Sequence, residues 1–160
     1  MRLRPIVAHD LGEVLDLNAS EVPKVGPLTA PALADLVALC DLALLAEDDD
    51  GLLGMVLALA PGAAYGSLNY GFFETRGTDH LYVDRIAVAG RARRRGIASA
   101  LYDAVEQRAR GTGRAEVTCE VNVVPRNEGS LRFHAARGFV EVGQQDVGDH
   151  RVSLLAKPVV

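Results

Sequence analysis

The feature that most restricts the fold is a strand, a helix and a second strand in direct succession. The segment HLYVDRIAV at 80–88 is almost continuously apolar, which predicts a buried strand. In GIASALYDAVEQRAR at 96–110 the apolar residues recur at helical spacing, and AEVTCEVNV at 115–123 alternates between apolar and polar residues. Two strands joined through a helix within one sheet run parallel, so the sequence predicts a parallel pair inside a mixed sheet.

The other segments predict further strands and helices around this unit, with no repeat and no linker-like composition between them. Residues 1–7 alternate like a short strand, and the apolar runs on either side of the acidic turn DDDG predict a hairpin. We expect helices at 9–20, 30–40 and 127–138, a loop at 65–79, and a closing pair of strands at 139–157.

The size and composition of the chain fit one soluble domain that covers residues 1–160. The 160 residues are 49% hydrophobic and 24% charged, enough for one sizeable core and too few for two. The formal net charge of -4 argues against nucleic acid as a partner, because such proteins usually carry a basic surface. We expect no metal site. The oligomeric state stays open, a homodimer included.

Cysteine usage and hydropathy predict a cytoplasmic protein. Cys40 and Cys119 lie in apolar surroundings, and we expect both to be reduced thiols. The first residues lack the apolar core of a signal peptide, and the longest apolar stretch is too short and too interrupted to span a membrane. We therefore expect no membrane partner.

The stretch RARRRGIA at 91–98 places four arginines in five positions directly before the predicted helix. A helix N-terminus carries a partial positive charge and free amides, so arginines there work against the helix dipole. Between Asp84 and Ser99 the sequence offers no Ser, Thr, Asp or Asn to cap those amides. An anion such as a phosphate would resolve both problems. A solvated, charged loop is the alternative interpretation.

Spacing excludes two phosphate-binding loops and leaves a third. Gly90 and Gly96 are six residues apart with Ile97 next, which excludes a Walker A loop, and a single glycine at the helix start excludes a dinucleotide fingerprint. The remaining pattern, Arg/Gln-x-x-Gly-x-Gly/Ala, is satisfied by Arg93, Gly96 and Ala98. About thirty residues later, the pattern Asn-x-x-Ser-x-x-Phe-(Tyr/His)-x-x-x-Gly-Phe is satisfied by Asn127, Ser130, Phe133, His134, Gly138 and Phe139.

Together these two motifs resemble those of the GNAT superfamily of acyl-CoA-dependent N-acetyltransferases. The resemblance covers the motifs between about 80 and 140, and the order of elements extends it to nearly the whole chain. It implies an α/β (α+β) fold with a mixed, mostly antiparallel sheet of six or seven strands and helices on both faces. The central parallel pair is expected to splay apart and admit acetyl-CoA.

The resemblance also implies which residues contact acetyl-CoA. The pyrophosphate would lie on the loop before the helix, and the pantetheine arm would pair with the backbone of the preceding strand. The second motif would flank the arm and the thioester, where Asn127 is also a candidate helix cap. The implied contacts, in chain order, are Ile86, Ala87, Val88, Arg93, Arg94, Arg95, Gly96, Ile97, Ala98, Ser99, Asn127, Ser130 and Phe133.

Three residues are candidates for the chemistry. Transfer of an acetyl group to an amine needs a base that removes the proton of the ammonium ion. The even positions of 115–123 form one polar strand face, and Glu120 on that face is the first candidate. Asp84, inside an apolar strand, is the second candidate, and a buried ion pair is its alternative role. Arg85 is not its expected partner, because neighbours on a strand face opposite sides.

His134 stands where members of this family often have a tyrosine, and it is the candidate acid for the departing thiolate. A surface position on the helix is the alternative. The resemblance implies that the amine acceptor contacts the early helices and the loop before the strand, which holds Tyr65, Asn69, Tyr70, Phe72, Phe73 and Glu74. Of these we expect Tyr70 and Phe72 to contact the amine, together with Asn122. Core packing is equally compatible with Phe72.

The predicted function is transfer of an acetyl group from acetyl-CoA to a primary amine of a small molecule or peptide, by direct attack on the thioester. Two other classes of function stay open. One is a non-catalytic acyl-CoA-binding or regulatory module of the same fold. The other is a nucleic-acid-binding protein that uses the arginine cluster.

Overall fold

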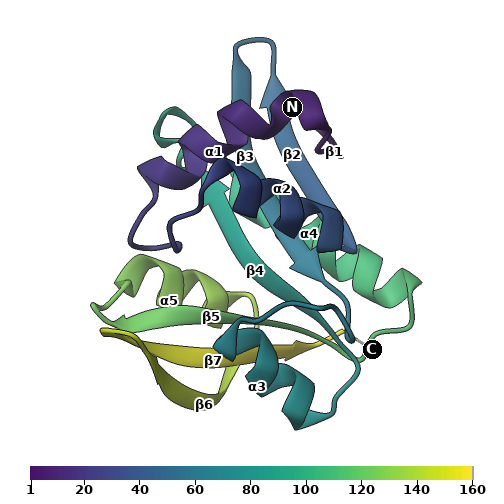
Figure 1. The fold of residues 1–160 in the computed structure, drawn as a ribbon, viewed down its shortest axis with the longest axis vertical. Helices are drawn as coiled ribbons and strands as arrows, with labels where there is room; N and C mark the ends of the chain where they lie inside the picture. The colour runs from purple at the N-terminus through teal and green to yellow at the C-terminus, as the bar shows by residue number, and fades with distance from the viewer. Residues whose placement is uncertain (160) are drawn as a thin grey trace.

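The computed structural model describes residues 1–159 and contains one mixed sheet with helices on both faces (Figure 1). The sheet order is β1-β2-β3-β4-β5-β7-β6. The strands are β1 (Arg2–Pro5), β2 (Leu42–Asp48), β3 (Gly51–Leu59), β4 (His80–Val88), β5 (Glu116–Val124), β6 (Val140–Val147) and β7 (His150–Pro158). The helices are α1 (Leu11–Ser20), α2 (Ala30–Leu39), α3 (Leu68–Arg76), α4 (Ile97–Gly111) and α5 (Glu128–Ala136). Of the described strand pairs, only β4 with β5 runs parallel, which confirms the mixed, mostly antiparallel sheet.

The strands β4 and β5 pair at their N-terminal ends and then separate. The paired residues are His80 with Glu116, Leu81 with Val117 and Tyr82 with Thr118. Figure 1 shows the two strands diverging from this short contact. β3 still pairs with β4 at Val88, and β7 still pairs with β5 at Val124, so each strand is supported on its outer side. The predicted splay of the parallel pair is therefore confirmed.

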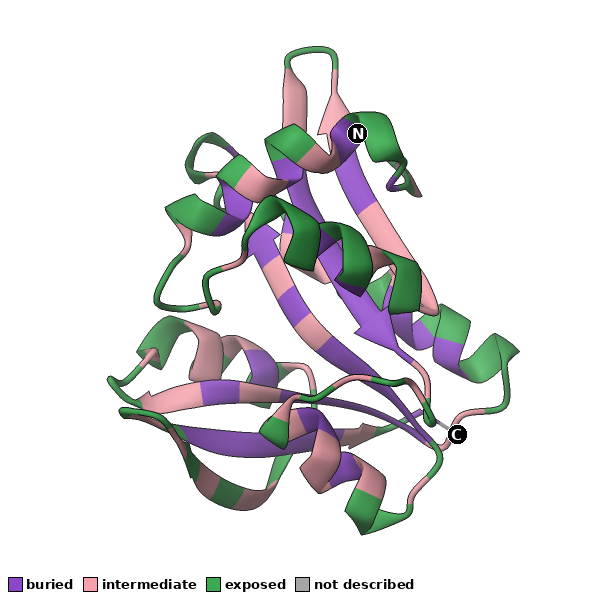
Figure 2. Ribbon diagram, viewed as in Figure 1, coloured by how far each residue is buried: buried purple, intermediate pink, exposed green. Residues whose placement is uncertain are grey.

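Each face of the sheet carries its own apolar layer. On one face, α4 packs on the strands through Leu101 and Val105, and both side chains are fully buried. Burying a side chain of this size contributes about 2 kcal/mol to stability. On the other face, α1, α2 and α3 enclose a second layer that includes Leu33 and Phe73. Figure 2 shows buried central strands beneath helices whose outer surfaces are exposed.

The loop expected at 65–79 contains α3, so that prediction is wrong. Ser67 caps the helix by accepting a hydrogen bond from the Tyr70 amide at 3.2 Å. Gly77 ends it in the left-handed conformation, at φ 76°, which glycine adopts without strain. The cap and stop residues are visible in the sequence. Gly71 and the aromatic residues, which are weak helix formers, hide the helical pattern between them.

Candidate active site

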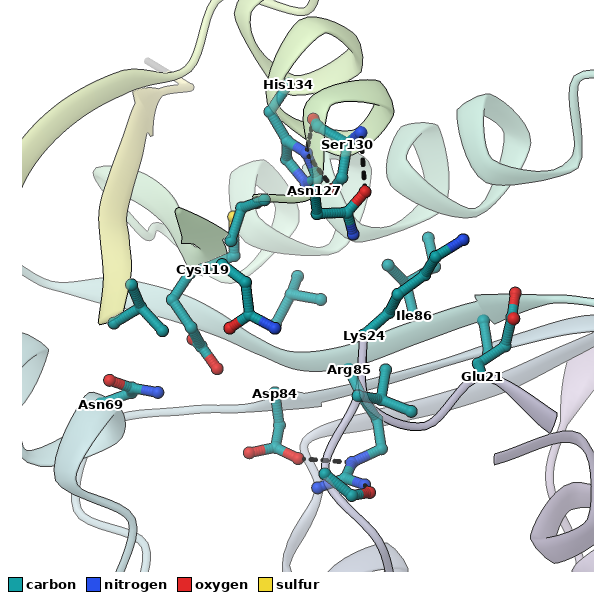
Figure 3. A pocket seen from close by; sticks show the side chains of 18 of the residues that line it. Glu21, Lys24, Asn69, Asp84, Arg85, Ile86, Cys119, Asn127, Ser130 and His134 are labelled. Atoms are coloured by element: carbon teal, nitrogen blue, oxygen red, sulfur yellow. Dashed lines mark hydrogen bonds and ion pairs between the residues drawn. The ribbon is translucent and has the colours of Figure 1, made fainter. Parts of the chain in front are cut away.

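A cavity of about 610 Å³ lies where β4 and β5 separate. Its walls come from β4, β5, α4, the starts of α3 and α5, the loop between α1 and α2, and the turn between β6 and β7. The predicted site residues that line it are Asp84, Ile86, Ala87, Val88, Arg93, Ala98, Glu120, Asn122, Asn127, Ser130, Phe133 and His134. In Figure 3, Asp84 and Arg85 lie on one side of this cavity, and Asn127, Ser130 and His134 lie on the opposite side.

A second cavity of about 260 Å³ adjoins the first at the start of α4. Val88, Arg93, Ala98 and Phe133 line both cavities. The second cavity is also lined by Ala92, Arg94, Gly96, Ile97 and Ser99. The structure therefore brings the arginine loop and the second sequence motif together along one continuous cleft.

The start of α4 has the free amides that the sequence predicts. Gly96 precedes the helix in the left-handed conformation, at φ 75°, and no side chain of the described residues caps it. Arg94 has a φ of 62°, which is rare for a residue with a side chain. Successive amides in such a turn point to a common side and form a concave site that favours anions.

The arginines of this loop have different partners. Arg93 contacts both carboxylate oxygens of Glu21, at 3.1 and 3.0 Å. Arg91 and Arg95 both reach Asp48 in the β2–β3 hairpin, at 3.3 and 3.4 Å. The Arg95 side chain is not part of either cavity wall, unlike the prediction, because this ion pair holds it toward the hairpin. Arg94 has no ion pair within residues 1–159.

Glu120 lies half-buried in the cavity wall, on the strand face that its alternation predicts. The neighbouring odd residues of β5 pack into the core beneath α4. The Tyr82 hydroxyl donates to Glu120 Oε2 at 2.7 Å. Burial, and then the negative charge of Asp84, raise the pKa of Glu120 to about 8. A carboxylate with this pKa exchanges protons readily near neutral pH.

Asp84 is paired with Arg85, contrary to the prediction. Arg85 Nε donates to Asp84 Oδ2 at 2.8 Å, and both side chains are nearly buried. Leu57 lies opposite Arg85 whereas Ala58 lies opposite Val83, so Asp84 is an extra residue in β4. A β-bulge of this kind breaks the alternation of side chains, and neighbours can then face the same side. The buried ion pair is thus the role that the structure shows for Asp84.

The Asp84–Arg85 pair is connected to two loops of the cavity wall. The Tyr65 hydroxyl donates to Asp84 Oδ1 at 2.7 Å. Arg85 Nη1 donates to the Gly26 carbonyl at 2.8 Å and to Asn18 Oδ1 at 2.9 Å. Both carboxylate oxygens of Asp84 therefore accept hydrogen bonds. The Asp84–Arg85 pair links β4 to the loops that contain Tyr65 and Gly26.

His134 is buried, with 4% of its surface exposed, and both of its ring nitrogens are engaged. Nδ1 lies 2.7 Å from the Ser130 carbonyl, which only accepts, so Nδ1 carries the proton. Nε2 then accepts from the Tyr102 hydroxyl at 2.6 Å. Burial lowers the pKa of His134, so the ring is neutral and holds no spare proton for a thiolate. The alternative that His134 lies on the surface of the helix is also excluded, because the side chain is buried.

Tyr102 is a polar residue of the cavity wall that the sequence analysis missed. It lies fully buried on α4 and lines the cavity beside His134. Burial and the nearby Cys119 and Glu120 groups raise the pKa of its hydroxyl, which therefore stays protonated. Its position in the apolar stripe of the helix gives no signal of a polar role, since a tyrosine there is typical of a core residue.

Two of the three expected acceptor contacts lie away from the cavity. Tyr70 is 2% exposed and donates to the Ala60 carbonyl at 2.6 Å, within the core below α3. Phe72 packs against Gly143 of β6, where an added Cβ would lie 3.0 Å from the ring. α3 turns both rings inward, which a loop would not do. Asn122 does line the cavity, and its amide donates to the Pro23 carbonyl at 3.3 Å.

Other residues line this end of the cavity. They are Tyr65, Ser67 and Asn69 around the start of α3, Pro23 to Pro27 between α1 and α2, and Val147, His150 and Val152 at the β6–β7 turn. Tyr65 and Asn69 belong to the loop that the resemblance implies for the acceptor, whereas no motif marks the other residues, which come from separate turns that meet only in the fold.

The described residues contain no helix that is both long and apolar enough to cross a membrane. They also contain no cluster of three or more His, Cys, Asp or Glu side chains that could hold a metal ion. Cys40 and Cys119 are both free thiols.

Several solved structures share the fold over nearly the whole chain. Ard1 from Thermoplasma volcanium superposes with a TM-score of 0.80 at 18% identity, covering 99% of this chain and 97% of that one. The ribosomal-protein-S18-alanine N-acetyltransferase from Escherichia coli superposes with a TM-score of 0.76 at 15% identity, covering 99% of this chain and 93% of that one. NAA60 from Arabidopsis thaliana, in complex with a bisubstrate analogue, superposes with a TM-score of 0.78 at 18% identity, covering 98% of this chain and 97% of that one.

Comparison at the level of sequence identifies the family. Among proteins with curated functions, none gives a significant match to the chain. The sequence model of the acetyltransferase (GNAT) family matches residues 17–139, a span that includes both motifs and most of the cavity wall. Because this match covers more than half of the chain, the protein belongs to the acetyltransferase (GNAT) family.

Proposed function

We propose that this protein is an N-acetyltransferase that moves an acetyl group from acetyl-CoA to a primary amine of a small molecule or peptide. The observation that carries the proposal is Glu120, a half-buried carboxylate with a pKa near 8 at the opening between β4 and β5. A base in this place can take the proton from an ammonium ion that enters the cleft.

Three features of the cleft fit acetyl-CoA, which supplies an activated thioester carbonyl. The uncapped start of α4, with Arg93 and Arg94 beside it, suits a pyrophosphate. The edge of β4 at 86–88 lies beyond the contact with β5 and offers backbone groups to an extended, amide-containing arm. Asn127 and Ser130 line the opposite wall. We call residues 86–99 with Asn127, Ser130 and Phe133 the donor half of the cleft.

The remaining part of the cleft suits the amine, and we call it the acceptor half. It consists of Glu120, Asn122, the Asp84–Arg85 pair and the separate turns that line this end of the cavity. Glu120 is its central group, because both oxygens of Asp84 already accept hydrogen bonds, from Arg85 at 2.8 Å and from Tyr65 at 2.7 Å. Tyr65, Asn69 and His150 add polar atoms that can orient an acceptor.

Glu120 would act on the ammonium form of the acceptor. An alkylammonium ion titrates near ~10 and a peptide α-ammonium near ~8, so both are largely charged at neutral pH. The proton moves from the ammonium nitrogen to Glu120, while the Tyr82 hydroxyl holds Oε2 in place. The neutral amine that results is the nucleophile. A backbone amide of β4 near 86–88 is placed to stabilise developing negative charge on the carbonyl oxygen.

The departing thiol needs little help from the protein. A thiol pKa of about 8.5 makes its thiolate a good leaving group at neutral pH. The engagement of both His134 nitrogens is therefore compatible with the reaction. His134 would act as a positioning residue that fixes the Tyr102 hydroxyl in the wall of the cleft.

The direct test combines a thermal-shift measurement with an assay of thiol release. Acetyl-CoA should raise the unfolding temperature, because a ligand of the native state stabilises it. The amine panel should include small amines, polyamines and peptides with a free α-amino group, since one solved relative is named for an alanine of a ribosomal protein. At least one class should release thiol. A thermal shift without thiol release from any amine would favour the non-catalytic acyl-CoA-binding module, and no shift would contradict the proposal.

A further inference from the structure

The loop between α1 and α2, residues 21–29, crosses the open side of the cleft and is hydrogen-bonded to both β4 and β5. Arg85 of β4 donates to the Gly26 carbonyl at 2.8 Å. Asn122 of β5 donates to the Pro23 carbonyl at 3.3 Å. The Gly26 carbonyl also accepts from Asn18 Nδ2 at 3.1 Å, and Leu28 packs against the core. The rest of the loop is largely exposed, as Figure 2 shows.

A third attachment joins this loop to the donor half. Glu21, the first residue after α1, binds Arg93 through both carboxylate oxygens at 3.1 and 3.0 Å. The Glu21 side chain is only 13% exposed, whereas that of Arg93 is 54% exposed. Glu21 is thus held in place by the fold, and the Arg93 guanidinium is the mobile partner that reaches it.

Both Glu21 oxygens bind a single nitrogen of the Arg93 guanidinium, Nη2. Each two-nitrogen fork that a guanidinium offers to a phosphate includes Nη2, so a phosphate bound in this way would have to displace Glu21 from it. A pyrophosphate at the start of α4 would compete with Glu21 for this fork, and its charge would also repel the Glu21 carboxylate.

We propose that Glu21 is a built-in competitor for Arg93, so that binding of the donor pyrophosphate detaches one end of the 21–29 loop. The inference rests on the proposed donor site. In the free protein the Glu21–Arg93 contact, which we call the latch, weakens donor binding and holds the loop against the cleft. Once the donor takes Arg93, the loop keeps its contacts with Arg85, Asn122 and Asn18.

The first test measures CoA binding by calorimetry in a double-mutant cycle. Glu21→Gln should tighten CoA binding about two- to fivefold, the range expected when an ion pair with one exposed member no longer competes. In the Arg93→Gln background the same change should have no effect, because the competition has gone. Glu13→Gln is the matched control, since it removes an equal charge from the exposed face of α1.

The second test follows the loop itself. The chain has two lysines, and Lys157 is followed by a proline, so a lysine-specific protease should cut only after Lys24 in this loop. When opening is fast, the cutting rate follows the population of the open form. Ligand-free Glu21→Gln should therefore be cut about two- to fivefold faster than the wild type, by the same factor as its gain in CoA affinity. Glu13→Gln should be cut at the wild-type rate.

The possible outcomes separate this inference from the proposed function. Failure of the wild type to bind CoA would remove both. Binding of CoA with equal affinity by wild type and Glu21→Gln would overturn the latch alone. Tightening that persists in the Arg93→Gln background would also overturn it, because the effect would then be long-range charge rather than competition. Equal cutting rates would show that the contact does not hold the loop.

Discussion

The donor and acceptor halves of the cleft place their charges in opposite environments. In the donor half, Arg93 is 54% exposed and pairs with Glu21 at 3.0 Å. In the acceptor half, the side chains of Asp84 and Arg85 are 5% and 8% exposed. Exposed ion pairs contribute little to stability, whereas removal of one member of a buried pair strands the other charge. The difference indicates that charges of the donor half can be removed at little cost to stability, whereas removal of one member of the Asp84–Arg85 pair in the acceptor half destabilises the fold.

Glu120 adds to this contrast, because burial raises its pKa. The raised pKa makes the charged form destabilising in the folded protein and suits the base of the proposed reaction. Its pKa of about 8 lies above the ordinary value of 4.5. Ionising Glu120 in the folded protein is therefore unfavourable, and stability is lost as the pH rises from about 4.5 to about 8. Below that window the carboxyl is protonated in both states and exerts no penalty.

The largest effect is expected for Glu120→Gln. Loss of a general base should lower kcat/KM by about 10²- to 10⁴-fold. The same change should raise the unfolding temperature relative to wild type at pH 8.5, with a smaller difference at pH 5, because the neutral amide removes the buried charge. Thiol-release assays and thermal unfolding at the two pH values measure both. Full activity in the variant would exclude Glu120 as the base.

The wild-type pH profile tests the same group without a substitution. As pH rises, Glu120 changes from the inactive carboxylic acid to the active carboxylate, so kcat/KM should rise with pH and level off above about 8. If the same rise of kcat/KM with pH is seen in Glu120→Gln, it reports deprotonation of the acceptor amine and not of Glu120.

A large loss of stability is expected for Asp84→Asn. The variant leaves the Arg85 guanidinium buried without its counter-charge, which should lower the free energy of unfolding by about 3–5 kcal/mol. Asp79→Asn is the matched control, since Asp79 is 53% exposed and binds Arg114 at 2.7 Å. Asp79→Asn should lower the free energy of unfolding by less than about 1 kcal/mol. Equal effects in urea unfolding would mean that burial does not distinguish the two ion pairs.

The donor half could be predicted from the sequence because most of it is one continuous segment. Residues 86–99 follow one another along β4, the arginine loop and the first turn of α4, and the uncapped helix start follows from the absence of a cap residue. The side-chain direction of Arg95 could not be predicted. It depends on Asp48, which is distant in the sequence and meets the loop only in the fold.

The acceptor half was predicted less well because its geometry depends on two departures from regular patterns. The bulge at Asp84 turns that residue and Arg85 toward the same side, and a single strand sequence does not reveal which residue is extra. α3 buries Tyr70 in the core and packs the partly buried Phe72 against Gly143. Glu120 and Asn122 were placed correctly in the cavity wall, since β5 keeps its alternation up to Asn122.

A moderate effect, confined to binding, is expected for Arg93→Gln. Loss of one charged contact to phosphate should weaken CoA binding about tenfold, and the loss should shrink at high salt. The free energy of unfolding should fall by about 1 kcal/mol at most, because the Arg93 member of the lost ion pair is 54% exposed. Calorimetry at two salt concentrations and urea unfolding check both parts. A loss of stability as large as that of Asp84→Asn would contradict the contrast between the halves.

The smallest effect separates two neighbouring arginines within the donor half. Arg94 lines the second cavity and has no ion pair among residues 1–159, whereas Arg95 is held by Asp48 at 3.4 Å. Arg94→Gln should weaken CoA binding about threefold, and Arg95→Gln by less than about twofold, since surface charges of this kind contribute up to about 1 kcal/mol. Both variants remove the same charge from adjacent positions, so the overall field changes equally. If the two affinities fall together, net charge rather than the direction of each side chain governs donor binding.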